Sequence, residues 1–290
     1  MALWTPAEIA TALWYDHSDL NTQFNATSGG ALVLPGGAIA RLENKSGNGG
    51  HCTQGTSSDR PTLQTNVQNG LAVGRYDGSN DQLFGNAAAE AATNAVPAMY
   101  LAIVAQATNF ASSSQPRLFQ CSTGDNTTNQ RVGLSFESSK WRFGCRRLNA
   151  NSIGVASSPG NADSTWNLAC GLADLSLTTS EALRLSINGT EVATSSLPGT
   201  STLTSNTNSA RVSIASLSTV NELAGDIGEI LLLVSLPSLE LRQTIEGYLA
   251  HKWGIDSKLP AGHPYRLLAP GEGGAGNTRR RRFALGGYGL

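Results

Sequence analysis

Residues 183–193 read LRLSINGTEVA, and this stretch decides the fold class. Apolar side chains occupy every second position of residues 183–187, which is the period of a strand with one buried face. Asn188-Gly189 then supplies the residue types of a two-residue hairpin turn, and residues 191–193 return as a second strand. The stretch therefore predicts an antiparallel β-hairpin.

The same pattern of short strands and turn residues continues on both sides of this hairpin. The run at 99–105 is almost continuously apolar, as expected for a central strand. Further strands are predicted at 13–15, 71–73, 117–121, 131–136, 141–146, 166–170, 211–214 and 227–234. Strands at this spacing, with no helices between most of them, predict a two-sheet β-sandwich.

One helix is predicted near the C-terminus, at about 238–253. Apolar residues recur at i, i+4, i+7 and i+8 from Leu241, so they share one face. Ser238 is a suitable N-cap, and Gly254 is a typical residue to end the helix. We expect this helix to pack on the outside of the sandwich.

The composition excludes several classes of protein. Only 14% of the 290 residues are charged, the net charge is −1, and 40% are hydrophobic, which argues against a disordered chain. No apolar run is long enough for a membrane-spanning helix. Residues 1–6 lack the basic start of a secretory signal, so we expect synthesis without export.

The cysteines and histidines do not show the spacing of a metal site. Four cysteines are widely separated along the chain, and no CxxC or Cys/His ligand pattern occurs. We therefore expect free, mostly buried thiols and no cofactor. These cysteines are Cys52, Cys121, Cys145 and Cys170.

Several longer segments resemble a known family. They are LWYD at 13–16, NKSGNGGH at 44–51, YDGSND at 76–81, GDIGEI at 225–230 and IEGYLAHKWG at 245–254. Together they resemble the concanavalin A-like (laminin-G-like) jelly-roll modules of bacteriophage structural proteins and large bacterial surface proteins, over roughly residues 9–266. The resemblance implies two packed antiparallel sheets of about six or seven strands each. It implies no particular activity, because this fold carries lectins, hydrolases and scaffolding modules alike.

No catalytic residues are predicted. Glycosidases of this fold carry paired carboxylates on one strand, and the nearest cluster here is Glu222, Asp226 and Glu229. Asp226 and Glu229 are three positions apart, so in a regular strand they would face opposite sides of the sheet. A glycosidase is therefore the least favoured alternative.

A structural calcium ion is a separate alternative. Asp77 and Asp81 offer carboxylate oxygens in a tight loop, and Asp226 could add another from a neighbouring strand. An Asp-Gly turn is the simpler interpretation, so no metal site is predicted and the calcium question stays open.

The tryptophans could form a platform for sugar rings or part of the core. Core packing is the commoner role of strand tryptophans, and we expect it for Trp166 and Trp253. For Trp141, contact with a ligand remains an alternative.

The C-terminal residues 271–290 are predicted to form a tail distinct from the domain at 1–270. Four arginines in a row (Arg279, Arg280, Arg281 and Arg282) precede the apolar residues Phe283, Leu285, Tyr288 and Leu290. Without those arginines the chain has 16 basic and 21 acidic residues, so an acidic body carries a basic end. The apolar residues favour docking on another subunit over binding to nucleic acid, for which no specific site is expected.

These features favour a virion structural protein of a tailed bacteriophage, assembled in the host cytoplasm. The jelly-roll would be a decoration or tail-fibre-associated module, and its displayed face could bind glycans of the host surface. Its partners would be other virion proteins or its own copies. The alternatives are a bacterial carbohydrate-binding module and, less favoured, a glycoside hydrolase.

Overall fold

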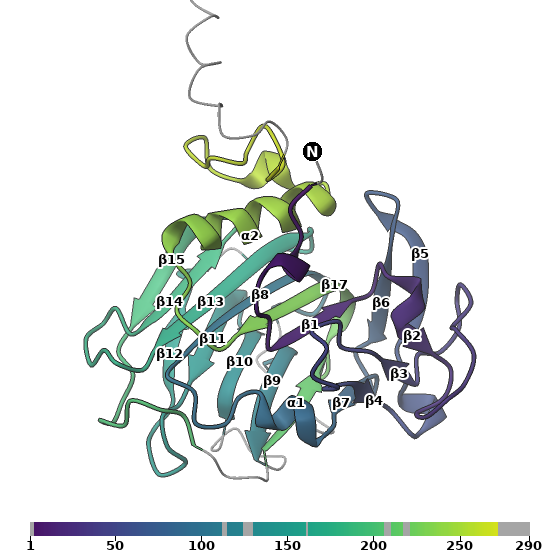
Figure 1. Cartoon of the computed structure of the whole chain (residues 1–290), viewed down its shortest axis with the longest axis horizontal. Helices are drawn as coiled ribbons and strands as arrows, with labels where there is room; N and C mark the ends of the chain where they lie inside the picture. The colour runs from purple at the N-terminus through teal and green to yellow at the C-terminus, as the bar shows by residue number, and fades with distance from the viewer. Residues whose placement is uncertain are drawn as a thin grey trace, which may run out of the picture.

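The computed structural model of the chain describes residues 3–111, 115–123, 130–160, 162–205, 210–216 and 221–271. Within these ranges the chain forms two packed antiparallel sheets, as predicted (Figure 1). The strands of sheet A are β1 (Leu13–Asp16), β5 (Thr62–Gln68), β6 (Leu71–Asp77), β8 (Ala98–Ala107), β13 (Asn167–Asp174), β14 (Leu183–Ile187), β15 (Thr190–Ser195) and β17 (Ala224–Leu233). Those of sheet B are β2 (Gln23–Phe24), β3 (Arg41–Leu42), β4 (Cys52–Thr53), β7 (Leu83–Gly85), β9 (Arg117–Thr123), β10 (Gln130–Glu137), β11 (Lys140–Cys145), β12 (Gly154–Ser157) and β16 (Ala210–Ile214).

The strand order extends the sandwich beyond the size that the family resemblance implies. Sheet A runs β15-β14-β13-β8-β17-β6-β5 with β1 also paired to β17, and sheet B runs β12-β11-β10-β9-β16-β7-β4-β3-β2. The described residues thus form sheets of eight and nine strands, where about six or seven each were expected. The difference in sheet B comes from the very short strands β2, β3, β4 and β7, which lengthen one edge.

The predicted hairpin is present between β14 and β15. Ile187 pairs with Thr190, and the two turn residues between them have positive φ angles, 51° at Asn188 and 76° at Gly189. Both angles match the turn that follows the twist of an antiparallel pair. This explains why the stretch at 183–193 identifies the fold class so directly.

The central strand β8 is apolar on both faces because both faces are covered. Met99, Leu101 and Ile103 belong to the core between the two sheets. Tyr100 and Val104 belong to a second core, between sheet A and the C-terminal helix. Alternation along the strand assigns these two sets to opposite faces, so the sandwich has three layers here.

The outer layer is α2 (Leu239–Lys252), the predicted helix, which lies along one side of the sandwich (Figure 1). Ser238 caps its N-terminus, accepting a hydrogen bond from the backbone N–H of Leu241 at 3.1 Å. Gly254 follows the helix with a φ of 64°, a conformation that favours glycine. Ile245 and Leu249 pack on the outer face of sheet A.

Other helical segments are short. The sequence analysis missed α1 (Ala87–Ala91), whose N-cap Asn86 accepts hydrogen bonds from two backbone N–H groups. The 3-10 turns of the described chain are η1 (Pro6–Glu8), η2 (Leu20–Thr22), η3 (Ser57–Asp59) and η5 (Asp256–Lys258). Neither α-helix in the described ranges has the length and apolar character that crossing a membrane would require.

The N-terminal segment and the segment after α2 meet beside that helix. The backbone N–H of Trp4 donates to the carbonyl of Pro270 at 3.2 Å. Leu267 nearby in the chain is 83% exposed, and Leu3 is also exposed. Both ends of the described chain therefore lie on the α2 side of the sandwich (Figure 1).

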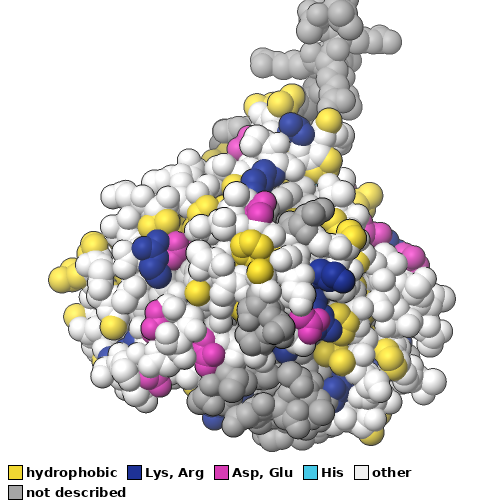
Figure 2. Space-filling model, turned by 180° about the vertical axis from the view of Figure 1, so that it is seen from behind, with side chains coloured by type: hydrophobic (Ala, Val, Ile, Leu, Met, Phe, Trp, Pro, Cys, Tyr) yellow, Lys and Arg dark blue, Asp and Glu magenta, His cyan; other side chains and the backbone are white. Residues whose placement is uncertain are grey.

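The surface carries few charged groups, as the low charge content of the sequence implies, and the cysteines are where the sequence predicts them. Figure 2 shows a face made mostly of uncharged side chains and backbone, with few Lys, Arg, Asp or Glu groups. All four cysteines are free and buried, as expected.

Candidate functional site

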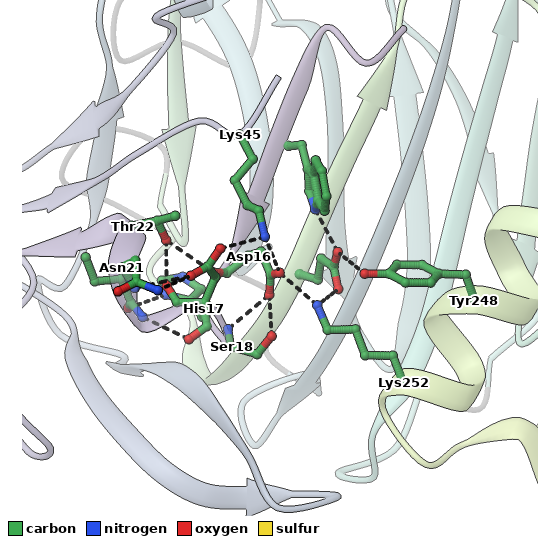
Figure 3. A network of polar contacts seen from close by, with 12 residues as sticks. Asp16, His17, Ser18, Asn21, Thr22, Lys45, Tyr248 and Lys252 are labelled. Atoms are coloured by element: carbon green, nitrogen blue, oxygen red, sulfur yellow. Dashed lines mark hydrogen bonds and ion pairs between the residues drawn. The ribbon is translucent and has the colours of Figure 1, made fainter. Parts of the chain in front are cut away.

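Four of the five segments that carry the family resemblance converge on one buried polar cluster between β1, β17 and α2 (Figure 3). We call it the Glu229 network. Its members are Trp14, Asp16, Lys45, Glu229, Tyr248, Lys252 and Trp253. Segments far apart in the sequence thus meet in one cluster, to which 13–16, 44–51, 225–230 and 245–254 contribute and 76–81 does not.

Glu229 is the centre of this network and is fully buried. Its Oε1 accepts from Trp14 Nε1 at 2.7 Å and from the Tyr248 hydroxyl at 3.4 Å. Its Oε2 accepts from Lys252 Nζ at 2.7 Å and from Trp253 Nε1 at 3.1 Å. Both oxygens are thus satisfied by protein donors, which is the condition for keeping a carboxylate inside a fold.

Lys252 joins this carboxylate to a second one. Its Nζ lies 2.8 Å from Asp16 Oδ2, and Lys45 Nζ lies 3.1 Å from the same oxygen (Figure 3). Burial alone would raise the pKa of Asp16, but Lys252 and Lys45 outweigh it and hold that pKa below its ordinary value. Burial, reinforced by Asp16, raises the pKa of Glu229.

The Glu229 network therefore holds α2 against sheet A, and its carboxylates are not arranged as an acid–base pair. Lys252 from α2 neutralises carboxylates from β1 and β17, so the helix is fixed to the sheet at its C-terminal end. A glycosidase pair needs oxygens that are free to meet a substrate and a water. Here protein donors hold both oxygens of Glu229.

The expectation that Asp226 and Glu229 face opposite sides of the sheet is wrong. The pairing of β17 with β8 shifts between Ile227 and Glu229, so Gly228 is an extra residue in a β-bulge. Ile227 points into the inner core, and both carboxylates consequently lie on the outer face of sheet A. Asp226 is still separate from the network, because Arg75 holds both of its oxygens at 2.7 and 2.8 Å.

The structure brings two of the three calcium candidates together. Asp77 ends β6 and Asp81 lies in the loop that follows, where the backbone N–H of Asp77 donates to Asp81 Oδ2 at 3.0 Å. Asp77 Oδ1 accepts from the backbone N–H of Ser79 at 2.8 Å, as in an ordinary Asx turn. Asp226 is paired with Arg75, and no group of three or more His, Cys, Asp or Glu in the described ranges is placed to hold a metal.

The tryptophans in question belong to the packed layers. Trp141 is 2% exposed and its ring lies 4.3 Å from that of Phe136, which places it in the inner core and not on a sugar platform. Trp253 is fully buried under α2 and stacks on the half-buried Trp166 at 5.9 Å. The core prediction for Trp253 is confirmed.

A different polar region, on the outer face of sheet B, is hollow. A cavity of about 520 Å³ opens over β9 to β12 and the loop 149–153, a size typical of small-ligand sites. Among the described residues that line it, three are arginines and none is Asp or Glu. We call this the Arg117 pocket.

Strand register places the arginines of this pocket side by side. Ser135 on β10 pairs with Arg117 on β9 and with Arg142 on β11. Leu134 and Phe136, on either side of Ser135, belong to the inner core, so Ser135 points outward. One cross-strand row therefore presents a hydroxyl between two guanidinium groups.

The neighbouring row has glycines on β10 and β11, which leaves room for the pocket. Gly133 pairs with Gly144, and the Gln130 side chain lies over both of them. A Cβ atom would approach Gln130 Nε2 to 2.5 Å at Gly133 and to 2.9 Å at Gly144. The two glycines thus let an amide group form the floor of the pocket.

Arg117 is a buried cation without a carboxylate partner. It is 2% exposed, and its terminal nitrogens donate to the Gln130 and Ser135 oxygens at 3.4 and 3.3 Å and to the Gln115 oxygen at 3.0 Å. Its Nε has no hydrogen-bond partner. Burial, followed by repulsion from Arg142, lowers the pKa of Arg117 to about 10, so it remains charged at neutral pH.

The sequence analysis missed this pocket, although a signal was present. Residues 141–146 alternate apolar residues with Arg142, Gly144 and Arg146, so the outward positions of β11 were readable. Their approach to Arg117 depends on strand pairing, which the alternation does not specify. The predicted anchoring residues Arg279 to Arg282, Phe283, Leu285, Tyr288 and Leu290 lie outside the described residues.

Comparisons with known proteins agree on the fold. No family model and no curated protein matches the chain. Solved structures that resemble it include botulinum neurotoxin domains. The serotype D ligand-binding domain in complex with N-acetylneuraminic acid has a TM-score of 0.54 at 11% identity, over 82% of this chain and 50% of that one. The serotype G binding domain has a TM-score of 0.56 at 10% identity, over 84% and 54%.

A third similar structure, the neurotoxin DC binding domain in complex with rat synaptotagmin II, has a TM-score of 0.53 at 11% identity, over 83% and 52%. The chain thus spans about half the length of the domains it matches. These likenesses establish a jelly-roll-like β-sandwich.

Proposed function

We propose that the chain is a non-catalytic glycan-binding module. The observation that carries this proposal is the Arg117 pocket, which combines amide, hydroxyl and guanidinium groups with the apolar side chains of Ile153 and Val155. A sugar ring needs that combination, since its hydroxyls seek polar partners and its C–H faces seek apolar ones. That no Asp or Glu lines the described pocket favours binding over glycoside hydrolysis.

The similar structures give further support. One of them is described in complex with N-acetylneuraminic acid and others as receptor-binding domains. Those domains are about twice as long as the matched part, so the sugar could belong to either half. The location of the site in this chain therefore rests on its own pocket.

The test is a glycan array followed by calorimetry with the purified chain. Ser152→Trp would fill the mouth of the pocket, because Ser152 is an exposed lining residue. Ser57→Trp is the matched control, since Ser57 is exposed near β4, well away from β12 in the order of sheet B. Binding that Ser152→Trp abolishes and Ser57→Trp leaves unchanged supports the proposal, and binding that neither variant affects would contradict it.

We also propose that this module is carried on the virion of a tailed bacteriophage, as a decoration or tail-fibre-associated protein assembled in the host cytoplasm. The support is the resemblance of five segments to phage structural modules. Residues 271–290 would anchor it to other virion proteins or to its own copies. The described chain reaches that segment beside exposed leucines at Leu3 and Leu267.

Two measurements test this part of the proposal. An antibody against the chain should label purified particles, whereas a bacterial carbohydrate-binding module would be absent from them. Deleting residues 271–290 should leave a folded, soluble sandwich that no longer joins the particle. Full incorporation of the truncated chain would refute the anchoring role.

A further inference from the structure

We infer that the glycan bound in the Arg117 pocket is acidic, with its carboxylate or sulfate group on the Arg117 guanidinium. This inference rests on the proposed glycan-binding function and narrows it to a ligand class. It concerns the charge of the ligand, which neither the fold nor the similarity to other structures determines.

The positive charge of Arg117 is not balanced by a carboxylate of any described residue in contact with it. Arg117 is 2% exposed and its hydrogen-bond acceptors are the neutral oxygens of Gln115, Gln130 and Ser135. A buried charge is normally compensated by an opposite charge, because removing it from water is otherwise expensive. Glu137, two residues beyond Ser135 on β10, is already paired with Arg142 and also accepts from Gln115. An anionic ligand would supply the missing compensation.

The Nε of Arg117 is a hydrogen-bond donor that the described residues do not use. In Arg75 the Nε and one terminal nitrogen together hold both oxygens of Asp226. In Arg117 the Nε has no partner, and the corresponding terminal nitrogen makes one bond, to the amide oxygen of Gln115. A ligand carboxylate that displaces this amide would complete the same two-bond arrangement, which is the strong form of arginine–carboxylate recognition.

The lining of the pocket also suits an anion. The glycine pair Gly133 and Gly144 leaves room for the Gln130 side chain, whose oxygen accepts from Arg117 at 3.4 Å. No Asp or Glu is among the described lining residues, so an anion would not be repelled at contact distance. Ser135 between the two arginines adds a neutral donor.

The experiment compares sugars that differ in charge. Lactose, 3′-sialyllactose and lactose 3′-sulfate are titrated calorimetrically into the full chain, with inorganic sulfate as a fourth probe. We expect the acidic trisaccharide or the sulfated sugar to bind at least about tenfold more tightly than lactose, in keeping with a charge-assisted hydrogen bond. The two acidic sugars distinguish a carboxylate site from a sulfate site.

Variants then assign the preference to the pocket. Arg117→Met should remove the preference for acidic sugars, and Arg142→Gln should weaken it without touching the buried guanidinium. Arg184→Gln is the control, because Arg184 forms exposed ion pairs on sheet A. If Arg117→Met does not fold by circular dichroism, Arg142→Gln and the salt dependence of the preference carry the test.

The outcomes separate this inference from the proposed function. Equal, Ser152→Trp-sensitive binding of lactose and both acidic sugars would overturn the acidic ligand and leave glycan binding intact. Binding of inorganic sulfate as tight as that of the sugars would show a free-anion site and overturn the glycan assignment. No binding of any of the four probes would count against both.

Discussion

Replacing Glu229 by alanine should destabilise the protein far more than removing any exposed ion pair. The substitution deletes a fully buried carboxylate and leaves the indole N–H groups of Trp14 and Trp253 without their acceptor. It also removes one of the two carboxylates that Lys252 Nζ contacts, and Asp16 remains as the other. Breaking a buried ion pair from one side costs about 3–5 kcal/mol when the remaining charge has no other partner, and less here because Lys252 keeps Asp16. Each indole N–H left unsatisfied adds about 1–3 kcal/mol, reduced wherever water enters the new cavity.

We therefore expect a loss of at least about 3 kcal/mol, which is a large part of the roughly 5–15 kcal/mol that stabilises a typical domain. The measurement is urea denaturation followed by circular dichroism. Tryptophan fluorescence is unsuitable because Trp14 and Trp253 both contact the mutated side chain. Glu191→Ala is the matched control, since Glu191 pairs with Arg184 at 3.2 Å on the surface and should change stability by about 1 kcal/mol or less.

A double-mutant cycle shows whether the loss arises from the ion pair. Glu229→Gln keeps the shape of the side chain and removes its charge, and Lys252→Met removes the cation from α2. If the ion pair between Glu229 and Lys252 holds α2 on sheet A, the double variant should lose clearly less stability than the sum of the two single losses. Additive losses, or a Glu229→Ala loss no larger than that of Glu191→Ala, would refute the reasoning.

The sandwich itself was predictable because local patterns carry most of its information. Strands β8, β10, β11 and β14 have apolar residues at inward positions, and the Asn188-Gly189 turn fixes one hairpin without any distant contact. Strand β5 was missed because Thr62, Gln64 and Gln68 make it polar. It forms the edge of sheet A, where one neighbour suffices and apolar residues are not required.

The failure at Asp226 and Glu229 has a different cause. Counting positions along a strand assumes regular pairing, and one extra residue reverses the face of everything beyond it. Gly228 makes that bulge possible here, with the Trp253 ring packed against it from α2. The bulge decides which face Glu229 occupies, and the ring that packs on it comes from a residue 25 positions further along the chain.

The Arg117 pocket could not be predicted because it also depends on strand pairing, in this case among the three strands β9, β10 and β11. Arg142 sits at an ordinary outward position of β11, where a solvated charge is the usual outcome. Arg117 reaches the same face only because the pairing of β9 with β10 shifts between Leu134 and Ser135, which makes Leu118 an extra residue in a β-bulge. Only the register through Ser135 brings Arg117 and Arg142 into one row. Arg117 is a candidate binding group because it is buried, whereas most arginines at such positions are solvated.

Three further predictions concern the bulge and the loop after β6. Gly228→Ala should cost about 1–3 kcal/mol in urea denaturation, because its Cβ would lie 2.6 Å from the Trp253 ring, whereas Gly55→Ala, with open space around it, should be nearly neutral. Millimolar calcium should leave the thermal midpoint unchanged, because Asp226 is held by Arg75, and a clear upward shift would restore the calcium alternative. The third prediction is a pH dependence at Asp81, whose pKa is raised to about 7 by burial and by repulsion from Asp77. In the unfolded chain this carboxyl titrates near about 3.9, so between about pH 4 and 7 the folded state binds more protons and stability falls as the pH rises. Asp81→Asn stays neutral and can still accept the hydrogen bond from the Asp77 backbone. The variant should therefore match the natural chain at pH 4 and exceed its stability at pH 8 by on the order of 1–2 kcal/mol after screening by solvent. A difference between the two proteins that does not change with pH would show that the Asp81 carboxyl titrates normally in the fold.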